Sequence, residues 1–282
     1  MRLRNVKRSR NIEDRRGRGG KGVAGVGGLG VGGVLFVLAI GYFTGIDVTP
    51  LLNGGAQPQQ TSDPRALTEA EQQAGEFSAR VLATTEEVWT GIFPQAFGKP
   101  YDPPVMVLFS QVTSSPCGNA SGATGPFYCP ADEKAYLDTD FFATMRSQLG
   151  AGGDFAAAYV IAHEVAHHIQ NELGILGQVN AARQQVSTRE ANALTVRLEL
   201  QADCLSGVWA RNVAGLMEKG DLEEALNAAR KIGDDHLQKR AGRVPQPHTF
   251  THGTSEQRQR WFVTGYESGD PNQCNTFDAD RL

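Results

Sequence analysis

Apolar residues recur at helical spacing through most of the chain beyond residue 65. In the segment 66–93 the apolar positions fall on one face of a helix: Ala74, Phe77, Val81, Leu82, Val88 and Ile92. The same period, together with capping residues and terminal glycines, predicts four more helices: 155–174 with Asp154 as its cap, 188–215, 221–233 and 255–267. We therefore expect a predominantly helical body.

Two stretches between the first and second predicted helices favour β-structure instead. Residues 103–110 form a short apolar run behind two prolines, which is typical of a strand. Residues 127–142 predict two short strands around a turn at Pro130–Glu133, and the Gly-, Ser- and Pro-rich segment before them predicts a loop. The expected fold class is α+β, predominantly helical, with a small sheet preceding the helix that begins near Asp154.

The N-terminal region differs from the rest in charge and hydropathy. Residues 1–22 carry nine Lys or Arg, and 23–45 contain no charged residue. A segment of that length can cross a hydrocarbon core, so 23–45 is predicted to be a transmembrane helix. The positive-inside rule then makes 1–22 a cytoplasmic tail and places the rest of the chain outside. A cleaved signal peptide is the alternative, although its basic region would be long and no clear cleavage site follows.

The remainder divides into a linker and one domain. Residues 46–64 are rich in Gly, Pro, Gln, Ser and Thr and predict a linker, and the domain spans 65–282. Apolar residues make up 40% of the 282-residue chain, which is enough for a buried core. The net charge is -4, and without the basic stretch the remainder is clearly acidic. This balance gives no support to a nucleic-acid partner.

Four cysteines all follow the predicted span, and none forms a CxxC pair with metal-site spacing. An even number on one side of a membrane suggests two disulfides in an oxidising compartment. Closeness in sequence favours Cys117–Cys129, which leaves Cys204–Cys274. Four buried free thiols are the alternative, because cysteine buries readily.

The sequence HEVAH at 163–167 predicts a metal site on the second helix. Positions four apart lie on one face, so His163 and His167 can bind one tetrahedral Zn²⁺ ion. Glu164 lies toward the open side of that ion, where it can act as the catalytic base on a metal-bound water. The alternative is a pair of core histidines in a chance match.

The next long helix contains ELQAD at 199–203, which supplies a third metal ligand in Glu199. Two histidines, a glutamate and one open position make up a common catalytic zinc site. Asp203 lies four residues later on the same face and can accept a hydrogen bond from the far nitrogen of a ligand histidine. A solvated helix face is the alternative for both acidic residues.

A third segment, 248–258, precedes and enters the last predicted helix. His252 is a candidate catalytic residue that donates to the oxyanion, and His248 is the second choice. Arg258 either orients Asp203 or binds a substrate carboxylate. The alternative for both histidines is an ordinary loop position. We expect His168 to point away from the metal, and we assign His236 no role.

Several of these segments together resemble the bacterial family called "putative neutral zinc metallopeptidase": 125–132 (GPFYCPAD), 136–142 (YLDTDFF), 153–170 (GDFAAAYVIAHEVAHHIQ), 199–204 (ELQADC) and 252–258 (HGTSEQR). The resemblance covers about 65–282. It implies a zincin-like fold with the HExxH helix and a downstream glutamate ligand. The last two segments are also similar to membrane metalloproteases with HExxH and ExxxD motifs, from which this chain departs in having one predicted span.

The favoured function is zinc-dependent hydrolysis of peptide bonds at the outer face of the membrane, in the periplasm or cell-wall space. Zincins hold a peptide along an edge strand, and Ala135–Asp138 is the candidate here from chain order. One alternative is a zinc-bound, membrane-anchored interaction or assembly factor without catalysis. The other is an amidase that acts on cell-wall peptides. Substrate and oligomeric state are left open.

Overall fold

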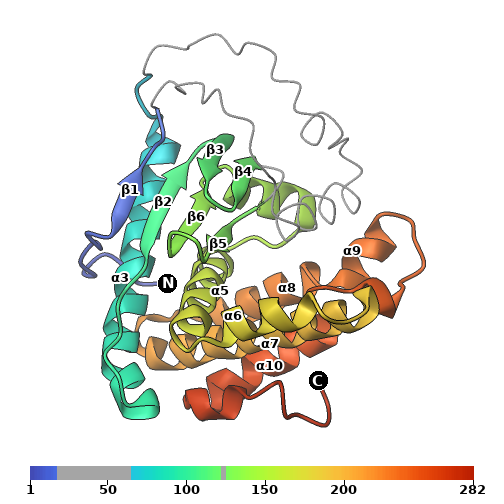
Figure 1. Cartoon of the computed structure of the whole chain (residues 1–282). Helices are drawn as coiled ribbons and strands as arrows, with labels where there is room; N and C mark the ends of the chain where they lie inside the picture. Colours follow the sequence, from blue (N-terminus) through green and yellow to red (C-terminus); the bar gives the residue numbers. More distant parts are fainter. Residues whose placement is uncertain (18–64, 122–124) are drawn as a thin grey trace.

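A computed structural model of the chain describes residues 1–17, 65–121 and 125–282 (Figure 1). Within these residues four strands form one sheet in the order β1-β2-β6-β5: β1 (Ile12–Asp14), β2 (Val105–Phe109), β6 (Lys134–Asp138) and β5 (Phe127–Cys129). The first three are parallel, and β5 is antiparallel to β6. A separate hairpin, β3 (Val112–Ser115) with β4 (Gly118–Ser121), lies where the sequence predicted a loop.

The predicted helices are present within a few residues of their expected ends: α3 (Glu69–Phe97), α5 (Asp154–Glu172), α7 (Thr188–Asn212), α8 (Asp221–Lys231) and α10 (Ser255–Ser268). Capping boxes fix the starts of three of them, because a hydroxyl accepts from a backbone N–H and a Glu or Gln three residues on reaches back. Shorter helical pieces were not predicted: α4 (Phe141–Thr144), η1 (Met145–Leu149), α6 (Ile175–Arg183), η2 (Ala214–Leu216), α9 (Asp234–Arg240), η3 (Pro247–Thr249) and η4 (Pro271–Cys274). The predicted α+β class, mainly helical with a small sheet before α5, is confirmed.

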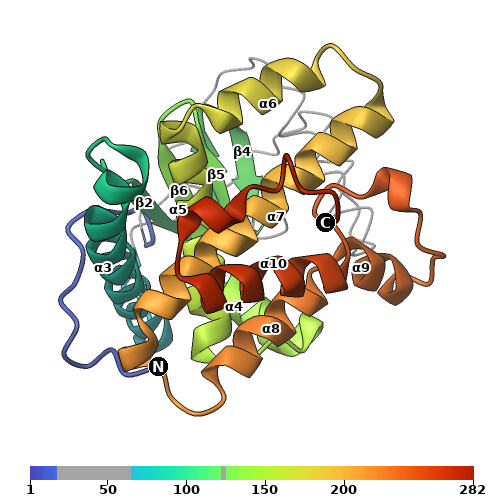
Figure 2. The ribbon, with the colours of Figure 1, turned by 90° about the horizontal axis from the view of Figure 1, so that it is seen from below.

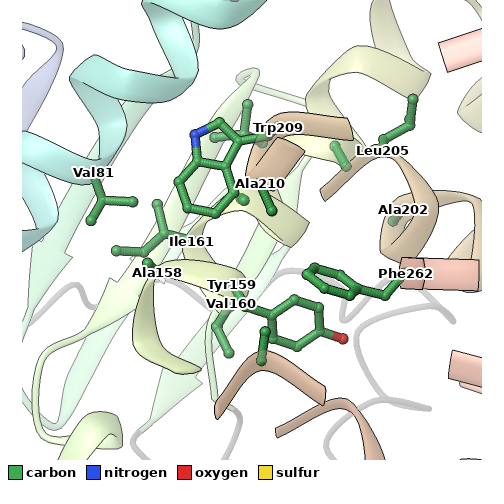
Figure 3. Close-up of a cluster of buried hydrophobic side chains, with 14 of the residues drawn as sticks. Val81, Ala158, Tyr159, Val160, Ile161, Ala202, Leu205, Trp209, Ala210 and Phe262 are labelled. Atoms are coloured by element: carbon green, nitrogen blue, oxygen red, sulfur yellow. The ribbon is translucent and has the colours of Figure 1, made fainter. Parts of the chain in front are cut away.

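Helix α5 occupies the centre of the fold. It packs against β5 and β6 on one side and against α7 and α8 on the other (Figure 1). Seen from below, α10 lies across α7 and α8 (Figure 2). Side chains of α3, α5, α7 and α10 meet in one apolar core, where Ile161, Trp209 and Phe262 are fully buried or nearly so (Figure 3). The one polar group of Trp209 is satisfied, because its indole N–H donates to Thr84 Oγ1 at 3.0 Å.

Two glycines allow α7 and α10 to approach closely. A Cβ on Gly265 of α10 would overlap the carbonyl oxygen of Cys204, and one on Gly207 of α7 would overlap that of Phe262. Only glycine fits at such a crossing, because any side chain would push the two backbones apart. The close approach brings Arg258, on the first turn of α10, to the acidic side chains of α7.

The basic N-terminal segment belongs to the folded domain. Strand β1 pairs in register with β2, Ile12 opposite Met106. The α-amino group of Met1 donates to Asp154 Oδ2 at 2.8 Å and to Glu218 Oε2 at 2.9 Å. Residues 1–17 and helix α5 are therefore parts of one body.

This arrangement corrects the membrane predictions. The predicted span 23–45 and the linker 46–64 lie outside the described residues. Over 1–17, 65–121 and 125–282 the structure contains no helix both long and apolar enough to cross a bilayer. The predicted single-pass membrane protein, anchored by an N-terminal helix with a cytoplasmic tail and an outer catalytic domain, is wrong: β1 pairs with β2, so residues on either side of the supposed span share one sheet.

Two smaller predictions have opposite outcomes. The disulfides Cys117–Cys129 and Cys204–Cys274 are both present, as expected. The segment Ala135–Asp138 is not an edge strand, because it lies in β6 between β2 and β5. Among the described residues the outer strand on that side is β5, which packs against α5. Chain order suggested the wrong strand because β5 comes earlier in the sequence but lies outside β6 in the sheet.

Candidate active site

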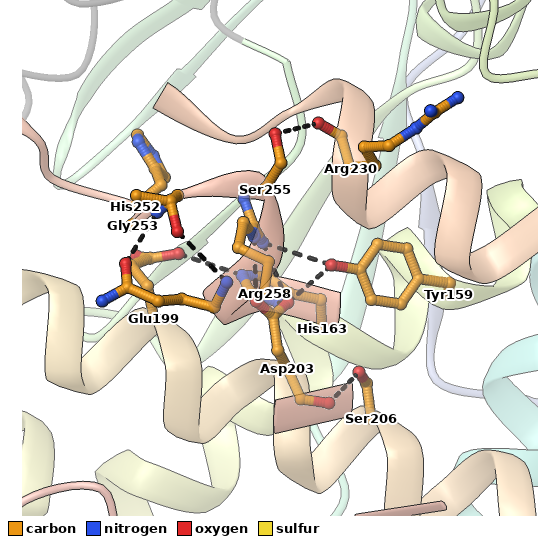
Figure 4. Close-up of polar contacts among 12 residues, drawn as sticks. Tyr159, His163, Glu199, Asp203, Ser206, Arg230, His252, Gly253, Ser255 and Arg258 are labelled. Atoms are coloured by element: carbon orange, nitrogen blue, oxygen red, sulfur yellow. Dashed lines mark hydrogen bonds and ion pairs between the residues drawn. The ribbon is translucent and has the colours of Figure 1, made fainter. Parts of the chain in front are cut away.

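Three side chains from two helices converge beside the core. His163 and His167 lie one turn apart on α5, and Glu199 faces them from α7. The Nε2 atom of His163 is 3.1 Å from Glu199 Oε2 (Figure 4). The Nε2 atom of His167 is 3.5 Å from Glu199 Oε1. One donor atom from each residue lies within 4.8 Å of the others, so the three could hold a single ion.

The spacing of these donor atoms fits a zinc ion. Ligands about 2 Å from a tetrahedral ion lie roughly 3.3 Å from one another. The distances from the two histidine nitrogens to the Glu199 carboxylate, 3.1 Å to Oε2 and 3.5 Å to Oε1, lie on either side of that value. Two neutral imidazoles and one carboxylate are also the donor set of many catalytic zinc sites, which leave a fourth position open.

The outer nitrogen of each histidine lies close to an acceptor, which for His167 is a hydrogen bond and for His163 is an ion-pair contact. His163 Nδ1 is 3.0 Å from Asp203 Oδ1, and His167 Nδ1 is 2.8 Å from Gln170 Oε1. A proton held on Nδ1 leaves the lone pair on Nε2, directed toward Glu199. The structure thus places Asp203 where the sequence predicted it. Gln170 was missed, although its position three residues after His167 on the same helix could have indicated it.

A buried arginine holds Asp203 in place. Arg258 Nε donates to Asp203 Oδ2 at 2.8 Å, and its Nη2 donates to Oδ1 at 2.9 Å (Figure 4). The Tyr159 hydroxyl donates to the same Oδ1 at 2.5 Å. Both charged side chains are almost completely buried. Two roles were considered for Arg258, and these contacts match the one in which it orients Asp203.

His252 is held by a second buried carboxylate. Asp234 Oδ2 accepts from the backbone N–H groups of Thr251, His252 and Gly253 at 2.8, 2.6 and 3.1 Å. Its Oδ1 lies 3.3 Å from His252 Nδ1. Gly253 adopts a φ of 90°, a left-handed conformation that favours glycine and that turns its N–H toward the carboxylate. Asp234 therefore fixes both the loop 251–253 and the imidazole ring of His252. Nothing in the sequence indicated this role of Asp234.

Burial and close charges shift the ionisation of the site. Burial raises the pKa of Glu164 to about 7. Burial alone would lower the pKa of His163, but hydrogen bonds to Asp203 and Glu199 outweigh it and raise that pKa to about 10. Burial would raise the pKa of Glu199, but the facing His167 and His163 hold it well below its usual range. Burial would likewise lower the pKa of His252, and Asp234 raises it. His252 is near enough that its charge also lowers the pKa of Glu199.

The other histidines lie away from this cluster. His168 is buried, with Nδ1 3.0 Å from the Tyr128 hydroxyl and Nε2 2.6 Å from the Asp102 carbonyl, so it links α5 to the sheet. His248 is exposed, and its carbonyl accepts from Asn192. The structure thus brings His252, and not His248, toward the cluster of His163, His167 and Glu199.

Comparison with known proteins agrees with this geometry. The family described as "Putative neutral zinc metallopeptidase" matches residues 1–277. The chain belongs to this family. The match includes the N-terminal strand and both helices of the histidine and glutamate cluster. Membership supports the general class of zinc metallopeptidase and specifies no substrate.

The relatives carry no assigned activity in their names. The chain is 47% identical over 287 residues to "Uncharacterized protein YpfJ" of Escherichia coli (strain K12), covering 98% of this chain and 99% of that protein. It is 43% identical over 219 residues to "Uncharacterized protein Rv2575" of Mycobacterium tuberculosis, covering 72% of this chain and 71% of that protein. No solved structure matches.

Proposed function

We propose that the protein is a zinc-dependent peptidase in which His163, His167 and Glu199 hold the metal and Glu164 is the catalytic base. The observation that carries the proposal is the convergence of the two Nε2 atoms and the Glu199 carboxylate, with each Nδ1 occupied by its own acceptor. When bound, zinc supplies a Lewis acid that polarises the scissile carbonyl and acidifies the attacking water.

The chain's own residues supply the proton transfers. Glu164 lies next to His163 on α5, and burial brings its pKa to about 7, so near neutral pH it both accepts and returns a proton. It takes the proton of the attacking water and delivers it to the leaving amine. His252, whose pKa Asp234 raises, donates a hydrogen bond to the oxyanion that forms on the carbonyl.

Strand β5 is the better candidate for binding the peptide backbone. It pairs with β6 on one side, and within the described residues no strand pairs with its other side. An extended peptide can add to such an edge through main-chain hydrogen bonds. Tyr128 of β5 contacts His168 of α5, which ties this strand to the helix that carries the proposed ligands.

The test uses the full chain, because residues 1–17 are part of the sheet. Zinc-loaded wild type, Glu164→Gln and Glu172→Gln would each be incubated with an unbiased peptide library, and cleavage would be read by mass spectrometry. Glu172 ends the same helix but contacts Asp102, so it is the matched control. We expect Glu164→Gln to keep its zinc and lose cleavage by at least about a hundredfold, as for removal of a general base. A wild type that is folded and zinc-loaded but cleaves nothing would contradict the proposal.

A further inference from the structure

Two buried glutamine side chains connect His167 to the C-terminal segment. His167 Nδ1 is 2.8 Å from Gln170 Oε1, and Gln170 Nε2 donates to Gln201 Oε1 at 3.0 Å. Gln201 Nε2 in turn donates to the carbonyl of Cys274 at 3.1 Å. Gln170 has a second anchor, because its Nε2 also donates to the Leu198 carbonyl at 2.7 Å. Both amides are buried, so water does not compete for these bonds.

The two backbone carbonyls fix which atom donates in each hydrogen bond of this series, which runs from His167 through Gln170 and Gln201 to Cys274. A backbone carbonyl can only accept, so the amide nitrogens of Gln170 and Gln201 must face Leu198 and Cys274. The Gln170 oxygen is then left for His167 and can itself only accept. His167 must therefore carry its proton on Nδ1, with the Nε2 lone pair directed to the cluster with Glu199.

The far end of the series is held covalently. Cys274 is joined by a disulfide to Cys204, which directly follows Asp203 on α7. The residues after it are also bound to this helix, because the Thr276 hydroxyl donates to the Arg197 carbonyl at 2.6 Å and Arg197 donates back to the Thr276 carbonyl. The position of the Cys274 carbonyl thus depends on a cross-link that spans 70 residues.

We propose that Gln170 and Gln201 are positioning residues for His167 and that the Cys204–Cys274 disulfide raises metal affinity through them. The two histidines would then be oriented by different means, His163 by the carboxylate of Asp203 and His167 by a neutral amide series. Loss of the cross-link lets the Cys274 carbonyl move and frees Gln201. Gln170 then keeps only its bond to the Leu198 carbonyl, and the ring of His167 is held less firmly. The inference rests on the proposed metal ligands but not on peptidase activity.

The first experiment measures the zinc dissociation constant of the full chain by competition with a chelator. Four variants are compared with wild type: Gln170→Met, Gln201→Met, the double variant Cys204→Ser/Cys274→Ser, and the control Cys117→Ser/Cys129→Ser. The control removes the other disulfide, which lies between the β-hairpin and β5. Loss of an outer partner of a ligand usually weakens metal binding about 10- to 100-fold. We expect that range for Gln170→Met, about tenfold for Gln201→Met, and weaker binding for Cys204→Ser/Cys274→Ser than for the control.

A second measurement separates positioning from general destabilisation. The ¹⁵N shifts of labelled histidine rings distinguish the two neutral tautomers, so His167 should hold its proton on Nδ1 in wild type and show a mixture in Gln170→Met. If wild type binds zinc and both Gln201→Met and Cys204→Ser/Cys274→Ser bind it with the same affinity, the inference is overturned. Failure of wild type to bind zinc would instead overturn the proposed metal site. If one variant does not fold, the other still tests the same link, since each breaks a different bond of the series.

Discussion

Replacing Arg258 with methionine should lower the folding stability of the protein while changing its zinc affinity little. Arg258 makes two charge-assisted hydrogen bonds to Asp203, and both side chains are almost fully buried. Two such bonds at about 1.5–3 kcal/mol each give roughly 3–6 kcal/mol, consistent with the 3–5 kcal/mol typical of breaking a buried pair. Urea unfolding of metal-free Arg258→Met should therefore show a loss of about 3–5 kcal/mol relative to wild type.

Metal affinity should respond differently. In Arg258→Met the contacts of Asp203 with His163 and Tyr159 remain, so zinc affinity should stay within a few-fold of wild type. The double variant Asp203→Leu/Arg258→Met removes both charges and should recover much of the stability. It should also bind zinc about 10- to 100-fold more weakly, because His163 loses its acceptor. A loss below about 1 kcal/mol in Arg258→Met, or a double variant no more stable than the single one, would refute the reasoning.

Three further predictions concern folding. Burial raises the pKa of Asp138 from 3.8 to about 6, so the folded protein holds this proton more tightly than the unfolded chain. The unfolding free energy should therefore fall by up to roughly 3 kcal/mol from this group as pH rises from about 4 to about 7. Urea titrations of Asp138→Asn should lack that fall. Gly265→Ala should lower the unfolding free energy by about 1–3 kcal/mol or more, because its Cβ meets the Cys204 backbone. Gly91→Ala, where nothing lies within 4 Å of the added carbon, should be neutral or stabilise by up to about 1 kcal/mol in thermal unfolding. Deletion of residues 1–17 exposes the partners of the buried Met1 and Leu3 side chains and should cost about 3–6 kcal/mol by the same assay; an unchanged midpoint would show that β1 is dispensable.

Local patterns predicted the parts of the site that lie on single helices. His163 and His167 share a face because they are four residues apart, and a capping box sets where α7 begins. Helix α5 begins after Gly153 without the side-chain cap that Asp154 suggested. Glu199 was found only by its place on the following helix. The disulfides followed from sequence distance and elimination.

Features made by long-range contacts could not be predicted in this way. The segment Ile12–Asp14 contains two acidic residues and lies among arginines, so it was interpreted as part of a tail. It forms a strand because β2 offers an unpaired edge and because Arg16 lies buried over Gly75 of α3. The role of Asp234 could not be predicted either, because its partner is a loop 18 residues later in the sequence that folds back onto its carboxylate.

The charges around His163 explain why a buried arginine lies beside the proposed metal site. In the metal-free protein the ring lies between Asp203 and Glu199, which raise its pKa to about 10 despite burial. A metal ion must displace that proton, and afterwards Asp203 would be left beside a neutral ring. Arg258 offsets the Asp203 charge in both states, so the buried carboxylate is paired whether or not the proton on His163 Nε2 has left. The close crossing at Gly207 and Gly265 is what brings α10 near enough to do this, and packing between helices thereby sets the chemistry of the ligand.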